Sequence, residues 1–236
     1  IKNRNDIEVP IIITKKMVND IFANKLHIIP KLIAEKPQIG MVNGLFATTC
    51  GNGGLTLIEI FKTLSDSKLS LLLTGQQGDV MKESMKCAKT IAWNIIPDNI
   101  KTKINKEWED KSWGLHIHCP EAATPKDGPS AGGAITLAII SRLCNIPVNN
   151  KIALTGEINL NGEIHAIGGL DIKIDGGKNA GVEKILFPHE NLQDLELIKR
   201  IKPEILDNIE VVSIKTIWDI LDHCLEEHDI EFNKQI

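Results

Sequence analysis

One short stretch of the sequence carries a side chain that could attack a carbonyl. In TPKDGPSAGG, residues 124–133, Ser130 stands among small residues directly before an apolar run. We predict that Pro129 lies in the first turn of a helix, where its missing N–H costs nothing. Ser130 would then lie beside unpaired backbone N–H groups at the positive end of the helix dipole. A serine there can act as a nucleophile while nearby amides stabilise the oxyanion, although an ordinary helix N-cap serine has the same local sequence.

A serine nucleophile needs a base, and the residues offer two kinds. His116 and His118 lie just upstream, and Asp127 could complete a triad with one of them. The alternative is Lys173, between two isoleucines in HAIGGLDIKIDGG, residues 165–177. A buried amine with a lowered pKa would serve as a base. A lysine whose stem covers apolar surface while its head reaches water fits the same stretch.

Apolar periodicity predicts the elements that must position these side chains. Alternation in WGLHIHC, residues 113–119, predicts a strand that presents both histidines on one face. The run AGGAITLAIISRLC, residues 131–144, is apolar nearly all round and predicts a buried helix. A strand and a hairpin turning on Asn161-Gly162 follow, and then a helix from about Leu170.

The remaining pattern mixes strands and helices without strict alternation. A helix capped by Thr14 and an amphipathic helix from Asp79, its predicted N-cap, to a stop at Pro97 are expected. Short strands are predicted in 41–49, 53–61, 68–75, 182–188 and 208–214, with a helix between the last two and a final helix carrying Ile217, Leu221 and Leu225. The expected fold class is α+β, with several short sheets and hairpins packed on helices.

Composition excludes several classes of function. The apolar fraction of 42 % suffices for a core, and the net charge of −4 comes without a basic patch interleaved with aromatics, so nucleic-acid binding is not indicated. No run of eighteen apolar residues suggests a membrane span, and the first ten residues lack a signal-peptide pattern. The five irregularly spaced cysteines favour a reducing intracellular setting.

The residues raise two hypotheses about cofactors, a metal site and a phosphate-binding loop. A metal site from His116, His118 and Cys119 is the first: two histidines at alternate strand positions can share an ion, but no third ligand stands at suitable spacing. The motif G-x-x-x-x-G-K-[ST] is absent, so GNGG and TGQQGD are interpreted as turns and not as phosphate loops.

At this point the sequence resembles a known family. PEAATPKDGPSAGG, residues 120–133, together with LTGEINLNGEIHAIGGLDIK, residues 154–173, is similar to the proteolytic domain of Lon, the ATP-dependent protease. IGMVNGLFAT, TGQQGDVMKESMKCA and FPHEN (residues 187–191) also match family segments in the same order. The resemblance covers roughly residues 38–225 and implies a Lon-type proteolytic domain that acts as a serine endopeptidase.

The resemblance implies a role for individual residues. Ser130 matches the nucleophile and Lys173 the lysine of a Ser-Lys dyad, and their spacing agrees with the family pattern. Thr155 matches a threonine that holds the lysine by a hydrogen bond. Asp127 matches an acidic residue whose rotation accompanies inactive and active states in some members. His116 and His118 match positions that are not catalytic, which disfavours the triad.

The sequence departs from the family pattern at a few positions. Asp171 and Ile172 stand where the family usually has Lys-Glu, Asn161 stands where an arginine is common, and the second glycine of SAGG replaces a bulkier residue. These changes put neighbour contacts or subunit packing in doubt and leave the dyad unaffected.

The resemblance also implies partners that lie outside this sequence. Residues 1–36 would be the end of the helical subdomain of an upstream AAA+ ATPase module, and residues 37–236 the proteolytic domain. ATP and Mg are expected only on that module, and no cofactor in this segment. The substrates would be unfolded or regulatory proteins, the assembly a hexameric ring, and the location the cytoplasm, a mitochondrial matrix or, for a viral protein, the host cell.

Chemistry sets a requirement on the dyad. An ordinary lysine pKa of ~10.4 leaves the amine protonated at pH 7. To act as a base its pKa must fall by roughly 3 units, about 4 kcal/mol, which burial among Ile167, Leu170, Ile172 and Ile174 could supply. A competing reading is a non-catalytic ring scaffold attached to an ATPase; such relatives lack a dyad residue, whereas both are present here.

Overall fold

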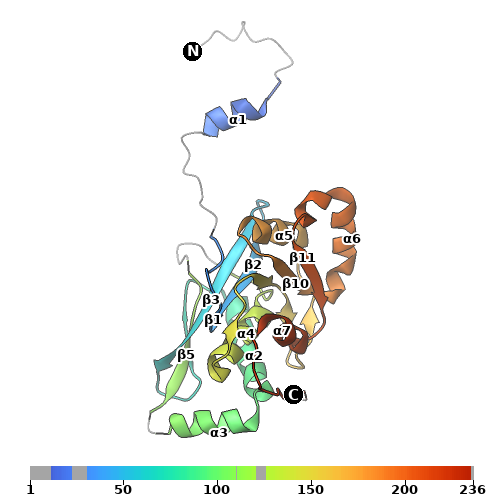
Figure 1. Ribbon diagram of the computed structural model, residues 1–236. Coiled ribbons are helices and arrows are strands. Elements are labelled where there is room, and N and C mark those ends of the chain that lie inside the picture. Colours follow the sequence, from blue (N-terminus) through green and yellow to red (C-terminus); the bar gives the residue numbers. More distant parts are fainter. Residues whose placement is uncertain (1–11, 23–30, 110, 121–125, 235–236) are drawn as a thin grey trace. The chain divides into compact units, whose positions relative to one another are not determined.

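The computed structural model describes residues 12–22, 31–109, 111–120 and 126–234 (Figure 1). The chain divides into two units, residues 1–30 and residues 31–236. The division lies ahead of the boundary expected near Pro37, because the Ile33 N–H donates to the Ala180 carbonyl at 3.2 Å and the Ala34 carbonyl accepts from Asn150 at 2.6 Å. Residues 31–36 therefore pack with the larger unit.

The first unit contains helix α1 (Lys15–Phe22). The Met17 N–H donates to the Thr14 hydroxyl at 3.2 Å, so the predicted N-cap is confirmed. The assignment of residues 1–36 to an ATPase subdomain stays a prediction.

A seven-stranded mixed sheet forms the frame of the second unit. Its strands follow the order β11 (Glu210–Ile214), β10 (Lys184–Pro188), β7 (Ile152–Leu154), β2 (Met41–Ala47), β3 (Gly53–Leu64), β5 (Trp113–His118) and β4 (Leu71–Thr74). β3 runs antiparallel to both neighbours, and the other pairs are parallel. Two short pairs complete the strands: β1 (Gln38–Ile39) with β6 (Pro147–Val148), and β8 (Glu157–Ile158) with β9 (Ile164–His165).

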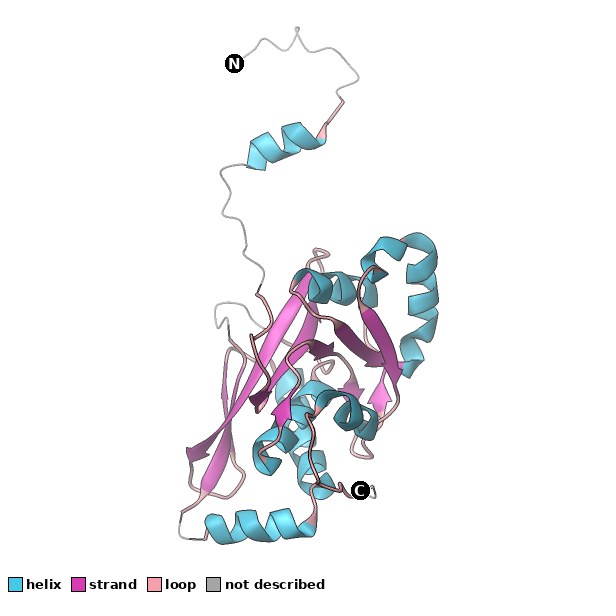
Figure 2. Ribbon diagram, in the orientation of Figure 1, coloured by secondary structure: helices cyan, strands magenta, loops and turns pink. Residues whose placement is uncertain are grey.

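Helices cover both faces of this sheet (Figure 2). Successive residues of β2 show the two sides: Gly44 faces Ala134 of α4 (Gly132–Cys144), and Leu45 lies against Gly177 of α5 (Leu170–Asn179). One hydrophobic core joins the sheet to α2 (Asp79–Ile95), α4 and α7 (Ile217–Cys224). A second core joins it to α5 and α6 (Leu192–Ile201). The expected mixture of helices and strands is confirmed.

Two local predictions were wrong, and one helix was missed. The N-cap of α2 is Gly78 and not Asp79. Helix α4 begins at Gly132, so Pro129 and Ser130 lie in the turn before it and not in its first turn. Helix α3 (Asp98–Glu107) was not foreseen, because it is polar and buries only Ile104.

Candidate active site

Thr155 lies at the centre of the candidate site, directly after β7. Its N–H donates to the Leu186 carbonyl of β10 at 3.1 Å, and the residue is fully buried. Its hydroxyl accepts a hydrogen bond from Lys173 Nζ at 3.0 Å and donates to the Ser130 carbonyl at 3.2 Å. The fold therefore brings Ser130, Thr155 and Lys173 together from three separate parts of the sequence.

Lys173 lies in the first half of α5 and is only 4 % exposed. Desolvation by burial lowers the pKa of its amine to about 8. Leu170 and Ile174 are buried on the same helix, as the sequence predicted. The alternative of an amine that reaches water is wrong, and the amine satisfies most of the requirement on a neutral base.

The Ser130 side chain is half-buried, and its backbone is held firmly. Its carbonyl accepts from the Gly156 N–H at 2.7 Å as well as from Thr155. The amides of Gly132 and Gly133 already donate to the Pro129 and Gly156 carbonyls, at 3.0 and 3.1 Å. The amides at the start of α4 are therefore not free for an oxyanion, which corrects the simple helix-terminus prediction.

Two other amides are available at this turn. The N–H groups of Ser130 and Ala131 donate to no acceptor among the described residues. They lie at the nucleophile itself, so they are the better candidates for stabilising an oxyanion.

Asp127 is exposed, and its carboxylate lies at the N-terminus of α2. Its Oδ1 accepts from the Met81 N–H at 3.0 Å and from the Gly128 N–H at 2.9 Å. It therefore caps α2 from a distant part of the chain, where a carboxylate is favoured by the helix dipole. Gly78 makes room for it, because a Cβ there would lie 2.3 Å from the Asp127 Cγ. The sequence did not reveal this role of Gly78.

The histidines take part in neither alternative site. His116 Nε2 and His118 Nδ1 lie 2.8 and 2.7 Å from the Thr74 hydroxyl. Cys119 is buried in the core beneath the opposite face of the sheet, and the described residues contain no cluster of three metal-ligating side chains. Asp127 bonds to α2 instead of a histidine. These contacts among the described residues give no support to the histidine triad or to the metal site.

The sequence matches the family model described as the Lon protease (S16) C-terminal proteolytic domain over residues 12–227. The chain belongs to this family. It is 38 % identical over 234 residues to a Lon protease homolog of Acanthamoeba polyphaga mimivirus, covering 97 % of this chain and 22 % of that protein. It is 40 % identical over 194 residues to a Lon protease of Fervidobacterium nodosum (82 % and 22 % covered), and 41 % identical over 199 residues to one of Haemophilus influenzae (84 % and 24 % covered). The chain thus spans less than a quarter of the length of these relatives.

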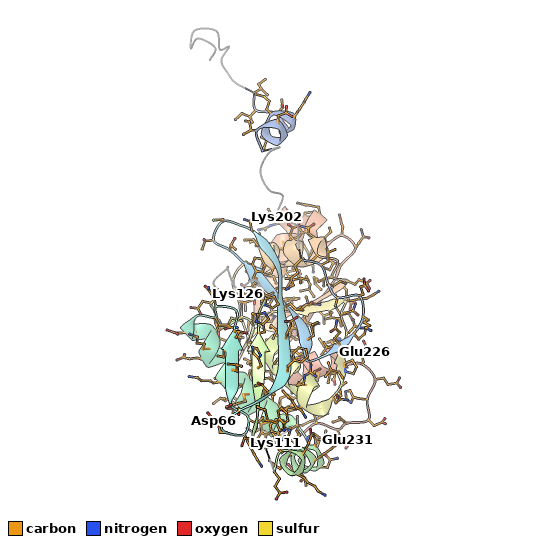
Figure 3. The ribbon with its side chains drawn as sticks, turned by 90° about the vertical axis from the view of Figure 1, so that its left-hand side faces the viewer. Asp66, Lys111, Lys126, Lys202, Glu226 and Glu231 are labelled. Carbon is orange, nitrogen blue, oxygen red and sulfur yellow. The ribbon has the colours of Figure 1, made fainter. Side chains whose placement is uncertain are left out.

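The departures from the family pattern have local explanations. The Asp171 carboxylate accepts a hydrogen bond from Lys202, which is labelled in Figure 3, at 2.7 Å. This hydrogen bond from the Lys202 ammonium lowers the pKa of the Asp171 carboxyl. Asn161 donates its N–H to Asn159 Oδ1 at 3.0 Å within the hairpin. A Cβ on Gly133 would lie 2.9 Å from Ile220, so α7 packs closely where bulkier residues stand in relatives. None of these three contacts involves Lys173 or Ser130.

In the part of the chain that the structure describes, no helix is long and apolar enough to cross a membrane.

Proposed function

We propose that this chain is the proteolytic domain of an ATP-dependent Lon-like protease, a serine endopeptidase with Ser130 as nucleophile and Lys173 as base. The observation that carries the proposal is the Lys173 amine, which is buried, shifted to a pKa of about 8 and tied through Thr155 to the Ser130 backbone. A buried amine without a carboxylate partner is costly for the fold, and such groups are concentrated at functional sites.

The geometry supports an acyl-transfer cycle. Neutral Lys173 takes the proton of the Ser130 hydroxyl, whose oxygen attacks the peptide carbonyl and forms a tetrahedral oxyanion. The ammonium then gives its proton to the leaving amine as the C–N bond breaks. In the second half, neutral Lys173 takes a proton from water as the water oxygen attacks the ester carbonyl. The ester C–O bond then breaks, the acid is released, and the Lys173 ammonium returns its proton to the Ser130 oxygen.

Thr155 and the turn amides would support these steps. Thr155 holds the amine without adding a negative charge that would favour the ammonium. The Ser130 and Ala131 amides would donate to the oxyanion, and one such donor is typically worth about 3–4 kcal/mol.

The partners belong to the whole protein and follow from the family. We place an AAA+ ATPase module, with its ATP and Mg, upstream of residue 37, and we expect a hexameric ring that encloses the sites. The substrates would be unfolded or regulatory proteins inside the cell, in the cytoplasm, a mitochondrial matrix or the host of a virus. The acyl-transfer cycle itself requires no cofactor on this chain.

The test is to label the chain with a fluorophosphonate and to measure cleavage of an unstructured fluorogenic peptide. Ser130→Ala should abolish both signals, and Lys173→Met should reduce both at least about a hundredfold. His116→Ala and His118→Ala serve as controls and should retain activity. Unreduced labelling in Lys173→Met would contradict the proposal that Lys173 is the base. If the native chain is not labelled even at high pH, the non-catalytic scaffold is favoured.

A further inference from the structure

The loop that leads into α5 is held by two consecutive residues that the proposed cycle does not use. The Ala166 N–H donates to Glu190 Oε2 at 2.7 Å, and the Ile167 N–H donates to Asn191 Oδ1 at 3.0 Å. Asn191 Nδ2 returns a hydrogen bond to the Ile167 carbonyl at 2.9 Å. Asn191 thus binds both backbone polar groups of one residue, as a neighbouring strand would.

The Asn191 amide is buried and fully committed. Asn191 is 4 % exposed, and its Nδ2 donates a second hydrogen bond to Asp194 Oδ2, with 2.6 Å between the two atoms. Oδ1 faces a donor and Nδ2 faces two acceptors, so only one orientation of the amide fits the site. An aspartate of the same shape would place an oxygen against the Ile167 carbonyl and the Asp194 carboxylate.

The outer side of this loop faces a cavity. Ile167, Gly168 and Gly169 line an open cavity of about 480 Å³, and a Cβ added to Gly168 would meet no atom within 4 Å. The loop is therefore fixed mainly from its Asn191 side.

The position of this loop determines where α5, the helix that carries Lys173, begins. Gly169, with φ +69°, is the N-cap of α5, and its carbonyl accepts the Lys173 N–H at 3.0 Å. The Lys173 amine must in turn reach Thr155, at 3.0 Å. A shift of about 1 Å in the start of α5 would break that contact, and misplacements of that size cost about a hundredfold in rate.

We propose that Asn191 is a positioning residue for Lys173: its amide clamps the Ile167 backbone and so fixes the first turn of α5 against Thr155. The inference deepens the proposed function and rests on it for its kinetic readout. It also makes a structural claim that can be tested without catalysis.

The experiment compares Asn191→Asp and Asn191→Ser with the native 236-residue chain. The carbon-13 shift of the Lys173 ε-methylene, assigned by its absence in Lys173→Met, is followed with pH. Loosening the clamp admits water to the amine, so the titration midpoint should rise by about one unit toward the ordinary lysine value in both variants. With the fluorogenic peptide, kcat should fall about tenfold or more while KM stays within about twofold.

Two comparisons separate positioning from other causes. Asn191→Ser adds no charge, so a rise seen only in Asn191→Asp would reflect the new carboxylate and overturn the proposal. Asn43→Asp is the matched control, because Asn43 is 5 % exposed and its amide donates to the Asn150 and Ile152 carbonyls, neither of which belongs to α5. It should lower stability and leave the Lys173 midpoint unchanged.

The outcomes are distinct from those of the proposed function. If the Lys173 titration midpoint rises in Asn191→Ser while the native chain shows no peptidase activity, the positioning role of Asn191 is supported and the proposed protease function is refuted. If Asn191→Asp does not fold, Asn191→Ser decides. A folded Asn191→Ser with the native midpoint and native kcat would overturn the inference.

Discussion

At the scale of single residues, the Thr155 hydroxyl explains how the lysine is held without a charged partner. A hydroxyl has one hydrogen and two lone pairs, and the hydrogen is committed to the Ser130 carbonyl. The lone pairs can accept from Lys173 whether the amine is neutral or protonated. Among the described residues no carboxylate is paired with this amine, and desolvation by burial lowers its pKa to about 8. About a tenth of the amines are then neutral at pH 7.

The pH profile of cleavage should follow this amine. We expect kcat/KM to rise roughly tenfold per pH unit below about 8 and to level off above it, because only neutral Lys173 accepts the serine proton. Peptide cleavage by the native chain between pH 6 and 10 provides the measurement, with His116→Ala as control. A flat profile between pH 6.5 and 8.5 would contradict the assignment.

The same shift predicts a stability cost. The folded pKa lies below the ordinary value of 10.5, so the unfolded chain binds the proton more tightly and the penalty is full below pH 8. Native stability should rise as pH increases from about 8 to 10.5. Lys173→Met should therefore be more stable than the native chain at pH 7, by up to about 3 kcal/mol. Urea unfolding at pH 7 and pH 10 tests this, since the advantage must shrink at the higher pH.

The residue chemistry was largely predictable, and its partners were not. Ser130 and Lys173 stand in distinctive local sequences, and the apolar neighbours of Lys173 indicated its burial. The amide of Gly133 is occupied by the Gly156 carbonyl, which is distant in sequence, so local pattern could not reveal this contact. The capping contact of Asp127 with Met81 is equally non-local.

At the scale of elements, α5 is docked by close backbone contact. A Cβ on Gly176 would lie 2.3 Å from backbone atoms of Gly53 and Gly54, and one on Gly53 would lie 2.1 Å from the Ile172 carbonyl. These glycines let the helix carrying Lys173 lie directly on β3. Helix propensity alone would disfavour two adjacent glycines, so packing decides here.

Gly176→Ala should be destabilising despite the better helix propensity of alanine. The new methyl group meets backbone that cannot move aside, and the expected net loss is about 1–3 kcal/mol, accompanied by loss of cleavage. Gly168→Ala is the matched control, because its Cβ would meet open space; its stability should stay within about 0.5 kcal/mol. Thermal unfolding of both variants gives the answer. Equal stability for the two would show that α5 is not tightly docked.

Elements with strong apolar periodicity were predicted well, and weakly patterned ones were not. Strands β2, β3 and β5 and helices α2, α4 and α5 lie where the sequence indicated. Helix α3 escaped because its single buried residue, Ile104, gives no period. The start of α4 was misplaced because proline is compatible with both a first helical turn and the turn before it.

At the scale of the whole molecule, both hydrophobic cores belong to the second unit. Every residue of the two cores lies after residue 30. A chain that begins at residue 31 should therefore fold with a free energy of unfolding within about 1 kcal/mol of the full chain. Chemical denaturation of the two chains is the measurement, with Glu231→Gln, at the opposite end from Lys202 in Figure 3, as a surface control. A clearly lower midpoint for the shorter chain would assign the first unit a stabilising role.

The strand order lay beyond prediction from this sequence by pattern alone. Neighbours such as β2 with β7, and β4 with β5, are joined by long intervening segments. Periodicity identifies which residues form a strand and which face is buried, but it does not say which strands pair.

The proposed nucleophile and its base come from opposite layers of the sheet: Ser130 precedes a helix of one core, and Lys173 lies on a helix of the other. We therefore expect the proposed active site to form only when the helices of both cores have packed onto the sheet. A polypeptide still emerging from the ribosome, or one that has partly come apart, carries an inert serine and a fully charged lysine. The proposed active site is therefore assembled only in the fully folded domain.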